Sequence, residues 1–216
     1  MNEANNKNIA YWEEWYKGHN CERSEITYDD WLDHFGEIIM PARGPAIDLG
    51  CGNGNDTLYL LNKGKSVIPC DSSMTAIQSI RDNFSEVREA LCFDMLEKFP
   101  ICSNMTDLVI ADLSLHYFTR EDTIKILKEI RRILINRGHL LARVNSMDDV
   151  NHGAGEGLEV EPHLYMTSDG RYKRFFDYAD IYDIFNIFEI KYLRDQVMTR
   201  YKLPKKAFIL DLKNRK

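Results

Sequence analysis

The sequence predicts an α/β fold in which a mostly parallel sheet carries helices on both faces. From residue 46 onward, short apolar runs alternate with amphipathic stretches, and this alternation is typical of βαβ units. Between the first apolar run and the next helical pattern, glycine stands at every second position, at residues 50, 52 and 54. Glycine allows a strand to turn sharply into a helix whose N-terminus faces a ligand. The same loop therefore predicts a nucleotide-type cofactor.

Helices are predicted before and between the strands. Aromatic and aliphatic residues recur at helical spacing in residues 9–16 and again in residues 31–39, which predicts an N-terminal helical cap over residues 1–43. Strands are predicted at residues 46–49, 66–70, 89–93, 107–111 and 139–144, with helices at 56–63, 74–84 and 120–135. The last of these helices is expected to end at Asn136-Arg137-Gly138 in a left-handed stop.

The chain beyond residue 145 changes character. Residues 148–157 are rich in Gly, Asp and Asn and predict a loop, either a functional lid or a plain surface loop. Residues 172–176 predict a hairpin arm, 178–185 a helix, and 188–198 with 206–212 an antiparallel pair at the sheet edge. No second domain boundary is evident, so we expect one domain with a cofactor-binding core at 44–146 and a substrate-side part at 147–216.

Composition excludes several classes of protein. The chain has 216 residues, 44% hydrophobic and 29% charged, with a net charge of -6. This acidic balance disfavours extended nucleic-acid tracks and anionic membranes as partners. No apolar run is long enough to span a bilayer and the first residues are polar, so a cytoplasmic location is expected. Five cysteines form no C-x-x-C pair, so no metal site and no disulfide framework is predicted.

The glycine spacing narrows the choice of cofactor. Dinucleotide folds use G-x-G-x-x-G, whereas the motif here is Asp48-Leu49-Gly50-Cys51-Gly52-Asn53-Gly54. A carboxylate at residue 48 would repel a pyrophosphate but would pair with a cationic ligand. The segment resembles motif I of the class I S-adenosylmethionine-dependent methyltransferases. With Thr57-Leu58-Tyr59-Leu60 behind it, it looks closest to the tellurite-resistance and thiopurine methyltransferase branch.

The resemblance implies a Rossmann-like, seven-stranded sheet with one antiparallel edge strand, and a set of S-adenosylmethionine-binding residues after successive strands. The methionine moiety is expected at the motif, held by Asp48, Gly50, Cys51, Gly52, Asn53 and Gly54. Ribose is expected at Asp71 and Ser72, and adenine at Asp94 and Met95. Two alternatives stay open: Asp48 satisfied by nearby backbone N–H groups, and Asp71 capping the next helix.

The methyl acceptor is expected where the fourth strand ends. There Asp112-Leu113-Ser114-Leu115-His116 places two candidate catalytic residues: His116 as a base, and Asp112 orienting the acceptor or, with Leu113, contacting the cofactor. The alternative for His116 is a ring packed beneath the cofactor. Trp15 is expected to cover the site or to pack in the core, and its aromatic face would favour a sulfonium. No Asn/Asp-Pro-Pro-aromatic segment follows this strand, which disfavours amino-group methylation of nucleobases.

Later segments suggest the nature of the acceptor. Six residues would surround it and together favour a polar and anionic molecule: Arg143, Asn145, His152, Tyr165, Arg171 and Arg174. Lys205 and Lys206 are expected to be solvated.

The predicted function is methyl transfer from S-adenosylmethionine to a small-molecule acceptor, giving S-adenosylhomocysteine. The alternatives are a protein or RNA methyltransferase, a non-catalytic S-adenosylmethionine-binding protein and, disfavoured by the short glycine gap, an NAD-dependent dehydrogenase.

Overall fold

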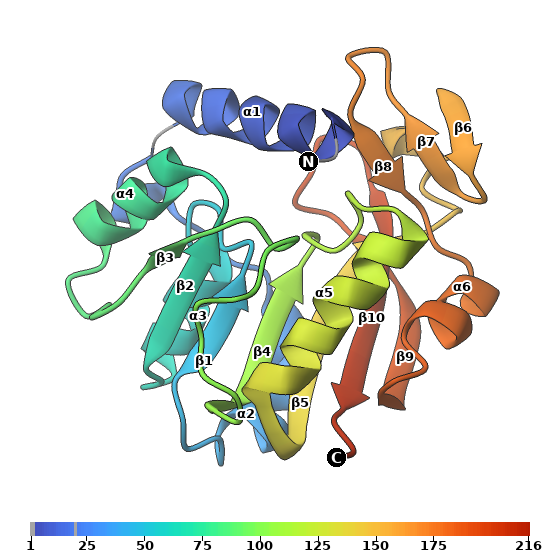
Figure 1. Cartoon of the computed structure of the whole chain (residues 1–216). Coiled ribbons are helices and arrows are strands. Elements are labelled where there is room, and N and C mark those ends of the chain that lie inside the picture. The colour runs from blue at the N-terminus through green and yellow to red at the C-terminus, as the bar shows by residue number, and fades with distance from the viewer. Residues whose placement is uncertain (1–2, 20) are drawn as a thin grey trace.

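The computed structural model describes residues 3–19 and 21–216, so residues 1, 2 and 20 of the predicted cap lie outside it. Seven strands form the central sheet: β1 (Ala46–Leu49), β2 (Val67–Asp71), β3 (Leu91–Cys92), β4 (Thr106–Asp112), β5 (Leu134–Asn145), β9 (Glu189–Met198) and β10 (Lys205–Lys213). Their spatial order is β3-β2-β1-β4-β5-β10-β9 (Figure 1). β1 to β5 are parallel, whereas β10 pairs antiparallel with both β5 and β9. The predicted α/β class is confirmed, and the reversed strand lies second from the sheet edge.

β1 is an inner strand of the sheet, and its residues are buried on both faces. Ile47 lies beside Ile68 of β2 and Val109 of β4, and all four residues of β1 are buried. Such continuous burial is typical of parallel strands covered by helices on both sides. The chain extends the sheet from β1 to β2 and β3, then returns to the other side of β1 with β4, so the strand order reverses between β1 and β4. Ligands of open α/β sheets bind at this point.

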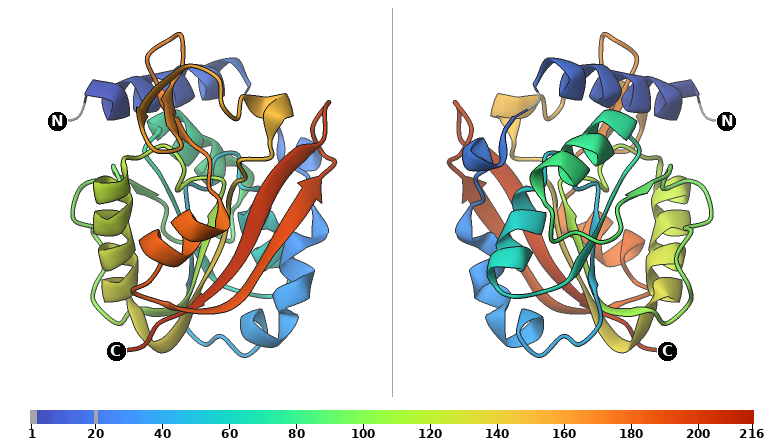
Figure 2. Two further views of the ribbon diagram at one scale, coloured as in Figure 1. Left: turned by 90° about the vertical axis from the view of Figure 1, so that its right-hand side faces the viewer. Right: turned by 90° about the vertical axis from the view of Figure 1, so that its left-hand side faces the viewer.

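Helices pack on both faces of the sheet. α5 (Arg120–Ile133) and α6 (Tyr178–Ile184) cover one face, and α2 (Gly36–Ile39) with α3 (Asn55–Asn62) covers the other (Figure 2). α5 begins where the Thr119 hydroxyl accepts a hydrogen bond from the Asp122 N–H, as an N-cap does. Within the described ranges, no helix is both long and apolar enough to cross a membrane.

Two predicted helices differ from the structure. α5 ends at Ile133 rather than at residue 135, and Leu134 already pairs with Thr106 as the first residue of β5. The pairing of β4 with β5 then shifts, from Thr106 opposite Leu134 to Leu108 opposite His139. The extra residues in β5 include Arg137, which has a φ of 68°. This left-handed position makes a bulge in the strand rather than a helix stop. The predicted helix at 31–39 is split into a 3₁₀ turn (Asp30–Phe35) and α2.

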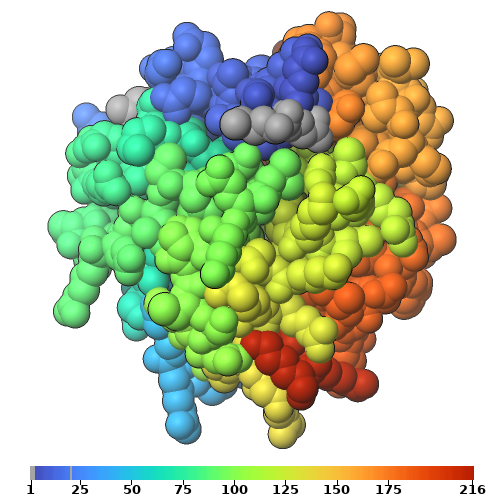
Figure 3. Space-filling model, in the orientation of Figure 1, coloured from blue at the N-terminus to red at the C-terminus, as the bar shows by residue number. Residues whose placement is uncertain are grey.

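The segment after β5 forms a second, three-stranded antiparallel sheet. Its strands are β6 (Leu158–Glu161), β7 (Leu164–Met166) and β8 (Tyr172–Arg174), of which only the last lies in a predicted hairpin arm. α1 (Glu3–Gly18) lies across the carboxyl ends of the parallel strands, between α4 (Met74–Asn83) and β8 (Figure 1). In the space-filling view α1 forms a ridge that continues into this hairpin (Figure 3). α1 therefore forms a roof over the carboxyl ends of the parallel strands, at the point where the strand order reverses between β1 and β4.

Candidate functional site

A cavity of about 530 Å³ lies beneath α1 at the carboxyl ends of the parallel strands. Its walls come from α1, the ends of β1, β2 and β4 with the segments after β1 to β4, the β7–β8 hairpin, the β9–β10 hairpin, and His152 of the turn Val150–His152. Twelve of the thirteen predicted cofactor residues line it: Trp15, Asp48, Gly50, Cys51, Gly52, Asn53, Asp71, Ser72, Asp94, Met95, Asp112 and Leu113. His116, the predicted base, lines it as well. The exception among the cofactor residues is Gly54.

The glycines of the loop have two different tasks. Gly50 and Gly52 have φ values of 79° and 52°, and a Cβ on either would meet Ser114 Cβ at 2.4 Å or Tyr16 Oη at 2.6 Å. Only glycine fits at these two cavity positions. Gly54, also at positive φ, begins α3, and a Cβ there would lie 2.7 Å from Ile80 Cδ1 of α4. The predicted cofactor contact at Gly54 is therefore replaced by close packing of α3 on α4.

Asp71 holds the loop in place at the end of β2. One of its carboxylate oxygens accepts from the Gly52 N–H at 3.0 Å, and the other accepts from the Ser73 N–H at 2.9 Å. Burial raises its pKa despite these bonds. The cap of α4 is Ser73, whose hydroxyl accepts from the Ala76 N–H, so Asp71 is not the helix cap. A carboxylate has further lone pairs, and those of Asp71 remain available to donors in the cavity.

Asp48 is a buried carboxylate at the end of β1. It accepts a hydrogen bond from the Thr57 hydroxyl at 2.6 Å. Burial, with the Asp112 and Asp71 carboxylates nearby, raises its pKa to about 7. Asp56, which the sequence analysis missed, lines the cavity beside it, and burial also raises the pKa of that carboxyl. This concentration of carboxylates suits a cationic ligand.

Asp94 follows β3 and faces α1. Its oxygens accept from Asn5 Nδ2 at 2.6 Å and from the Leu96 N–H at 2.9 Å. Asn5 thus makes the kind of contact that the exocyclic amine of adenine was predicted to make with Asp94. The neighbouring Met95 lies against the glycine loop, with its Cε 3.3 Å from where a Gly50 Cβ would stand.

Asp112 is committed to ion pairs. Arg143 donates to both of its oxygens, from Nε at 2.6 Å and from Nη2 at 2.7 Å, and Arg200 adds a contact at 3.1 Å. Burial favours the neutral acid, but the two guanidinium groups outweigh it and hold the pKa of Asp112 below its usual range. Arg143 also binds Asp29, tying the N-terminal segment to β4 and β5. An ionised, paired carboxylate is a poor proton acceptor, so Asp112 is not suited to act as a base. Its predicted roles, orienting the acceptor or contacting the cofactor, stay predictions.

His116 keeps an unpaired ring nitrogen at the cavity wall. Its side chain is 2% exposed, and Nδ1 has no hydrogen-bond partner among residues 3–19 and 21–216. Burial, together with the positive charges of Lys205 and Lys173, holds its pKa well below the usual value. The ring packs against Tyr117, with 4.2 Å between centroids. The imidazole is therefore neutral at physiological pH and able to accept a proton.

α1 is fastened over the cavity at several points. Glu13 accepts hydrogen bonds from the Ser73 and Thr75 hydroxyls, both at 2.6 Å, and Asn8 donates to the Tyr117 carbonyl at 3.0 Å. Trp12, Trp15 and Tyr16 of the same helix line the cavity, consistent with Trp15 as a covering residue. Near the middle of the helix, the guanidinium carbon of Arg171 lies 3.5 Å from the Tyr11 ring centroid.

The residues that line the acceptor side of the cavity differ from those that the sequence predicts. Of the six residues predicted there, His152 and Arg171 line the cavity, whereas Arg143, Asn145, Tyr165 and Arg174 do not. Lys205, expected to be solvated, is 5% exposed and forms an ion pair with Asp149 at 2.8 Å. Lys173 and Arg200 also line the cavity and were missed. No local pattern identifies these residues, since they reach the cavity only through the fold of the late segments.

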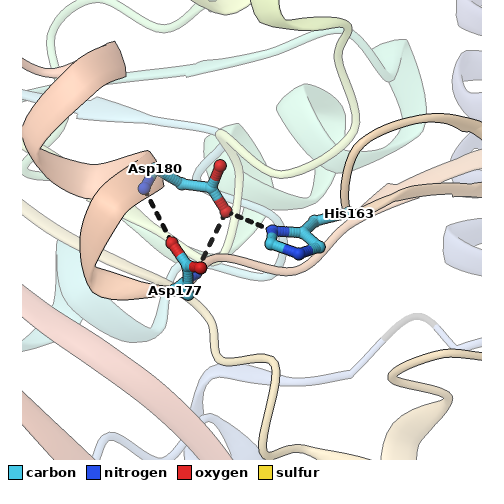
Figure 4. A group of neighbouring side chains, drawn as sticks. All are labelled: His163, Asp177 and Asp180. Atoms are coloured by element: carbon cyan, nitrogen blue, oxygen red, sulfur yellow. Dashed lines mark hydrogen bonds and ion pairs between the residues drawn. The ribbon is translucent and has the colours of Figure 1, made fainter.

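A separate group of polar side chains lies outside the cavity. His163 Nδ1 is 2.7 Å from Asp180, and Asp177 with Asp180 forms the capping box of α6 (Figure 4). Burial would lower the pKa of His163, but the bond to Asp180 raises it. The capping of α6 explains why these three side chains lie together.

The fold, the glycine loop and the strand-end acids are those of a class I S-adenosylmethionine-dependent methyltransferase domain. Residues 47–142 match the family model of a methyltransferase domain. S-Adenosylmethionine is the methyl donor of this enzyme family, in agreement with the sequence prediction of cofactor and enzyme class.

Particular relatives are similar over part or all of the chain. The putative methyltransferase YqeM of Bacillus subtilis is 31% identical over 126 residues, which are 57% of this chain and 51% of YqeM. The chain thus spans about half the length of the curated relatives it matches. A S-adenosylmethionine-dependent methyltransferase from Anabaena variabilis superposes with a TM-score of 0.72 at 18% identity, covering 100% of this chain and 96% of that one.

Two further structures bear on the acceptor and the branch. The 1,6-didemethyltoxoflavin-N1-methyltransferase of Burkholderia thailandensis, solved with 1,6-didemethyltoxoflavin and S-adenosylhomocysteine, has a TM-score of 0.66 at 16% identity over 100% of this chain and 92% of its own. TehB from Haemophilus influenzae has a TM-score of 0.62 at 17% identity over 86% and 61%. At such identities the likeness shows the fold alone, so the tellurite-resistance branch stays a prediction.

Proposed function

We propose that this protein transfers a methyl group from S-adenosylmethionine to a small-molecule acceptor. The observation that carries the proposal is the roofed cavity: carboxylates and a glycine cradle line one half, and α1 closes it from above. A macromolecular acceptor would have to displace the contacts of Glu13, Asn8 and Asn5. The Burkholderia relative in structure, which binds a small molecule in the same fold, is consistent with this choice.

The residues present fit the cofactor. Gly50 and Gly52 leave the space that a Cβ would fill, so backbone groups are open to a carboxylate. We assign Asp48 to the ammonium group, Asp71 to the ribose hydroxyls and Asp94 to the adenine amine, with Cys51, Asn53, Ser72, Met95 and Leu113 completing the wall. Bound S-adenosylmethionine supplies a methyl group activated by its sulfonium.

The chain itself positions the acceptor and handles any proton it releases. Proximity and alignment provide most of the acceleration in such a displacement. His116 is assigned as the base because Nδ1 is unpaired and the ring is neutral. Asp112 is assigned to holding Arg143 and Arg200 in place rather than to catalysis.

Three functional parts follow from these assignments. We propose residues 1–43 as the cap, 44–146 as the cofactor-binding core and 147–216 as the acceptor side of a single domain. The cytoplasmic location and the lack of nucleic-acid and membrane partners stay predictions from composition.

Calorimetry with S-adenosylhomocysteine tests the cofactor site. Asp71→Ala should weaken binding by at least about tenfold, because it removes a hydrogen-bonded carboxylate and loosens Gly52. Asp82→Ala is the matched control, since Asp82 contacts Gln78 on the exposed side of α4. Equal affinities of the two variants would refute the assignment of Asp71.

Methyl transfer is tested with a cell extract and tritiated S-adenosylmethionine. Label in the small-molecule fraction supports the proposal, and label in protein or RNA favours the macromolecular alternative. Binding of S-adenosylhomocysteine without labelling in any fraction would favour a non-catalytic binding protein. His116→Ala should reduce the labelling rate more than it weakens S-adenosylhomocysteine binding, as expected for a base.

A further inference from the structure

The charges that line the cavity are separated along the chain. The acidic lining residues all lie at the carboxyl ends of β1, β2 and β4 or in the segments that follow β1 and β3: Asp48, Asp56, Asp71, Asp94 and Asp112. The basic ones are Arg171, Lys173, Arg200 and Lys205, all from the β7–β8 hairpin and the β9–β10 connection. The acidic half matches a cationic methyl donor. The basic half is left for the acceptor.

Three of the four cations already have a carboxylate partner. Arg171 pairs with Asp169 at 2.9 Å, Arg200 with Asp112 at 3.1 Å and Lys205 with Asp149 at 2.8 Å.

Lys173 differs from them. Its Nζ donates to the carbonyl oxygen of His152. The charges of Asp149 and Glu156 act on it, but it forms no ion pair with a carboxylate of the described residues. The ammonium group is partly buried, and burial and the charge of Lys205 lower its pKa to about 8. A desolvated cation without a counterion is costly, and an anionic ligand would relieve that cost.

Lys173 stands close to the unpaired His116. The Arg174 N–H, one residue along β8, donates to the His116 carbonyl at 2.7 Å and so holds this strand against the end of β4. The positive charge of Lys173 acts on the His116 ring. Nδ1 of that ring is the buried polar atom without a partner. A cation and a neutral base are thus presented together at one wall of the cavity.

We propose that the methyl acceptor is a small organic anion whose negative group pairs with Lys173, which places the rest of the molecule beside His116. This inference rests on the proposed methyl transfer and adds the charge class of its substrate. Arg171 and Lys205 reinforce the positive potential but are neutralised locally by Asp169 and Asp149. Lys173 is therefore the specificity-determining residue.

A matched pair of probes tests the charge preference directly. Fluorine NMR would follow 4-fluorobenzoate and 4-fluorobenzamide, which share a shape and differ in charge, with the full chain saturated with S-adenosylhomocysteine at neutral pH. The benzoate should bind at least about tenfold more tightly than the amide, as expected for a charge-assisted contact. Affinity for the benzoate that does not exceed that for the amide overturns the inference.

Three variants assign the preference to a residue. Lys173→Met keeps the length of the side chain and should lose the benzoate preference, whereas Lys173→Arg should retain most of it. Lys191→Met is the control, because Lys191 is an exposed lysine paired with Glu189 on β9. An unchanged benzoate preference in Lys173→Met would also overturn the inference.

Calorimetry separates this result from the cofactor site. S-Adenosylhomocysteine should bind all three variants as it binds the wild type, which also shows that they fold. If the wild type does not bind S-adenosylhomocysteine, the proposed function itself fails. If it does bind and the benzoate shows no preference, only the anionic acceptor is refuted.

Discussion

The ionised Asp48 lowers the stability of the ligand-free fold but favours the binding of a cation. Its carboxylate is buried at the end of β1 and accepts a hydrogen bond from the Thr57 hydroxyl. Folding raises its pKa from an ordinary value of 3.8 to about 7. The protonated form therefore stabilises the fold at low pH, and this contribution is lost as the pH rises through about 7. At higher pH the ligand-free protein carries an uncompensated buried charge that a cation would neutralise.

Asp48→Asn tests this trade-off. Asparagine retains an oxygen for Thr57 but cannot ionise, so the ligand-free variant should melt at least about 2 °C above the wild type at pH 8. The difference should be clearly smaller at pH 5, because the penalty builds up between the unfolded pKa of 3.8 and the folded pKa of about 7. S-Adenosylmethionine should bind the variant at least about tenfold more weakly. Thermal denaturation at the two pH values measures the first effect and calorimetry the second. A melting difference that is the same at both pH values contradicts the argument.

His116 and His163 should titrate in opposite directions. Burial and two lysine charges lower the pKa of His116, whereas the bond to Asp180 raises that of His163. In proton NMR the His163 ring should titrate above pH 6.5, and the His116 ring should remain neutral down to well below that value. The variants His116→Gln and His163→Gln assign the two signals. A His116 signal that shifts near pH 6.5 would remove the case for a neutral base.

At the scale of elements, the sequence left open whether α1 covers the site or packs in the core, and the structure places it over the cavity. Its aromatic residues predicted a helix, but a helix with a largely exposed surface and three buried residues, Ala4, Asn5 and Asn8, is not a core helix. Polar contacts hold the helix along its length, chiefly those of Glu13 with Ser73 and Thr75. Such contacts exchange with water, so we predict that this roof opens to admit ligands.

Neighbouring glutamates on α1 allow a matched test of this roof. Glu13→Ala removes the bonds to α4, and S-adenosylhomocysteine should then dissociate roughly tenfold faster. Amide hydrogen exchange in residues 5–16 should also increase. Glu14→Ala is the control, since Glu14 makes a surface contact with Lys17. Equal dissociation rates for the two variants, measured by stopped-flow tryptophan fluorescence, would mean that Glu13 does not hold the roof.

The elements of the core could be predicted because their signals are local. β1, β2 and β4 are largely apolar runs. Because the carboxyl ends of parallel strands lie at one edge of the sheet, the sequence predicts cofactor contacts at Asp71 and Asp94, which follow two of the predicted strands. β6 and β7 gave no clear signal because they are only four and three residues long. β6 does alternate between apolar and acidic residues, but its apolar Leu158 and Val160 are exposed. Lys173 and Lys205 reach the cavity through pairings between distant segments, and no spacing in the sequence reports those.

At the scale of the whole molecule, the fold brings two charge populations to one cavity. Residues 48–112 supply carboxylates at or near the strand ends, and residues 171–205 supply cations from the β7–β8 and β9–β10 hairpins. Asp112 with Arg143 and Arg200 joins the two halves. A cationic donor and an anionic acceptor would each meet a complementary wall, and their attraction across the cavity would favour the alignment needed for methyl transfer.

This separation of charge predicts that the affinity for an anion at the basic side of the cavity depends on pH. Lys173 faces Lys205 and Arg171, which lower its pKa, and Asp149 and Glu156, which raise it, and burial leaves the value at about 8. As the pH rises from 7 to 9 the ammonium loses its proton, so the affinity for 4-fluorobenzoate should fall about tenfold. The neutral amide should show no such fall. Lys173→Arg stays protonated over this range and should bind the benzoate equally at both pH values, which fluorine NMR measures. A fall of the same size in the arginine variant would assign the titration to another group and remove Lys173 as the anion's partner.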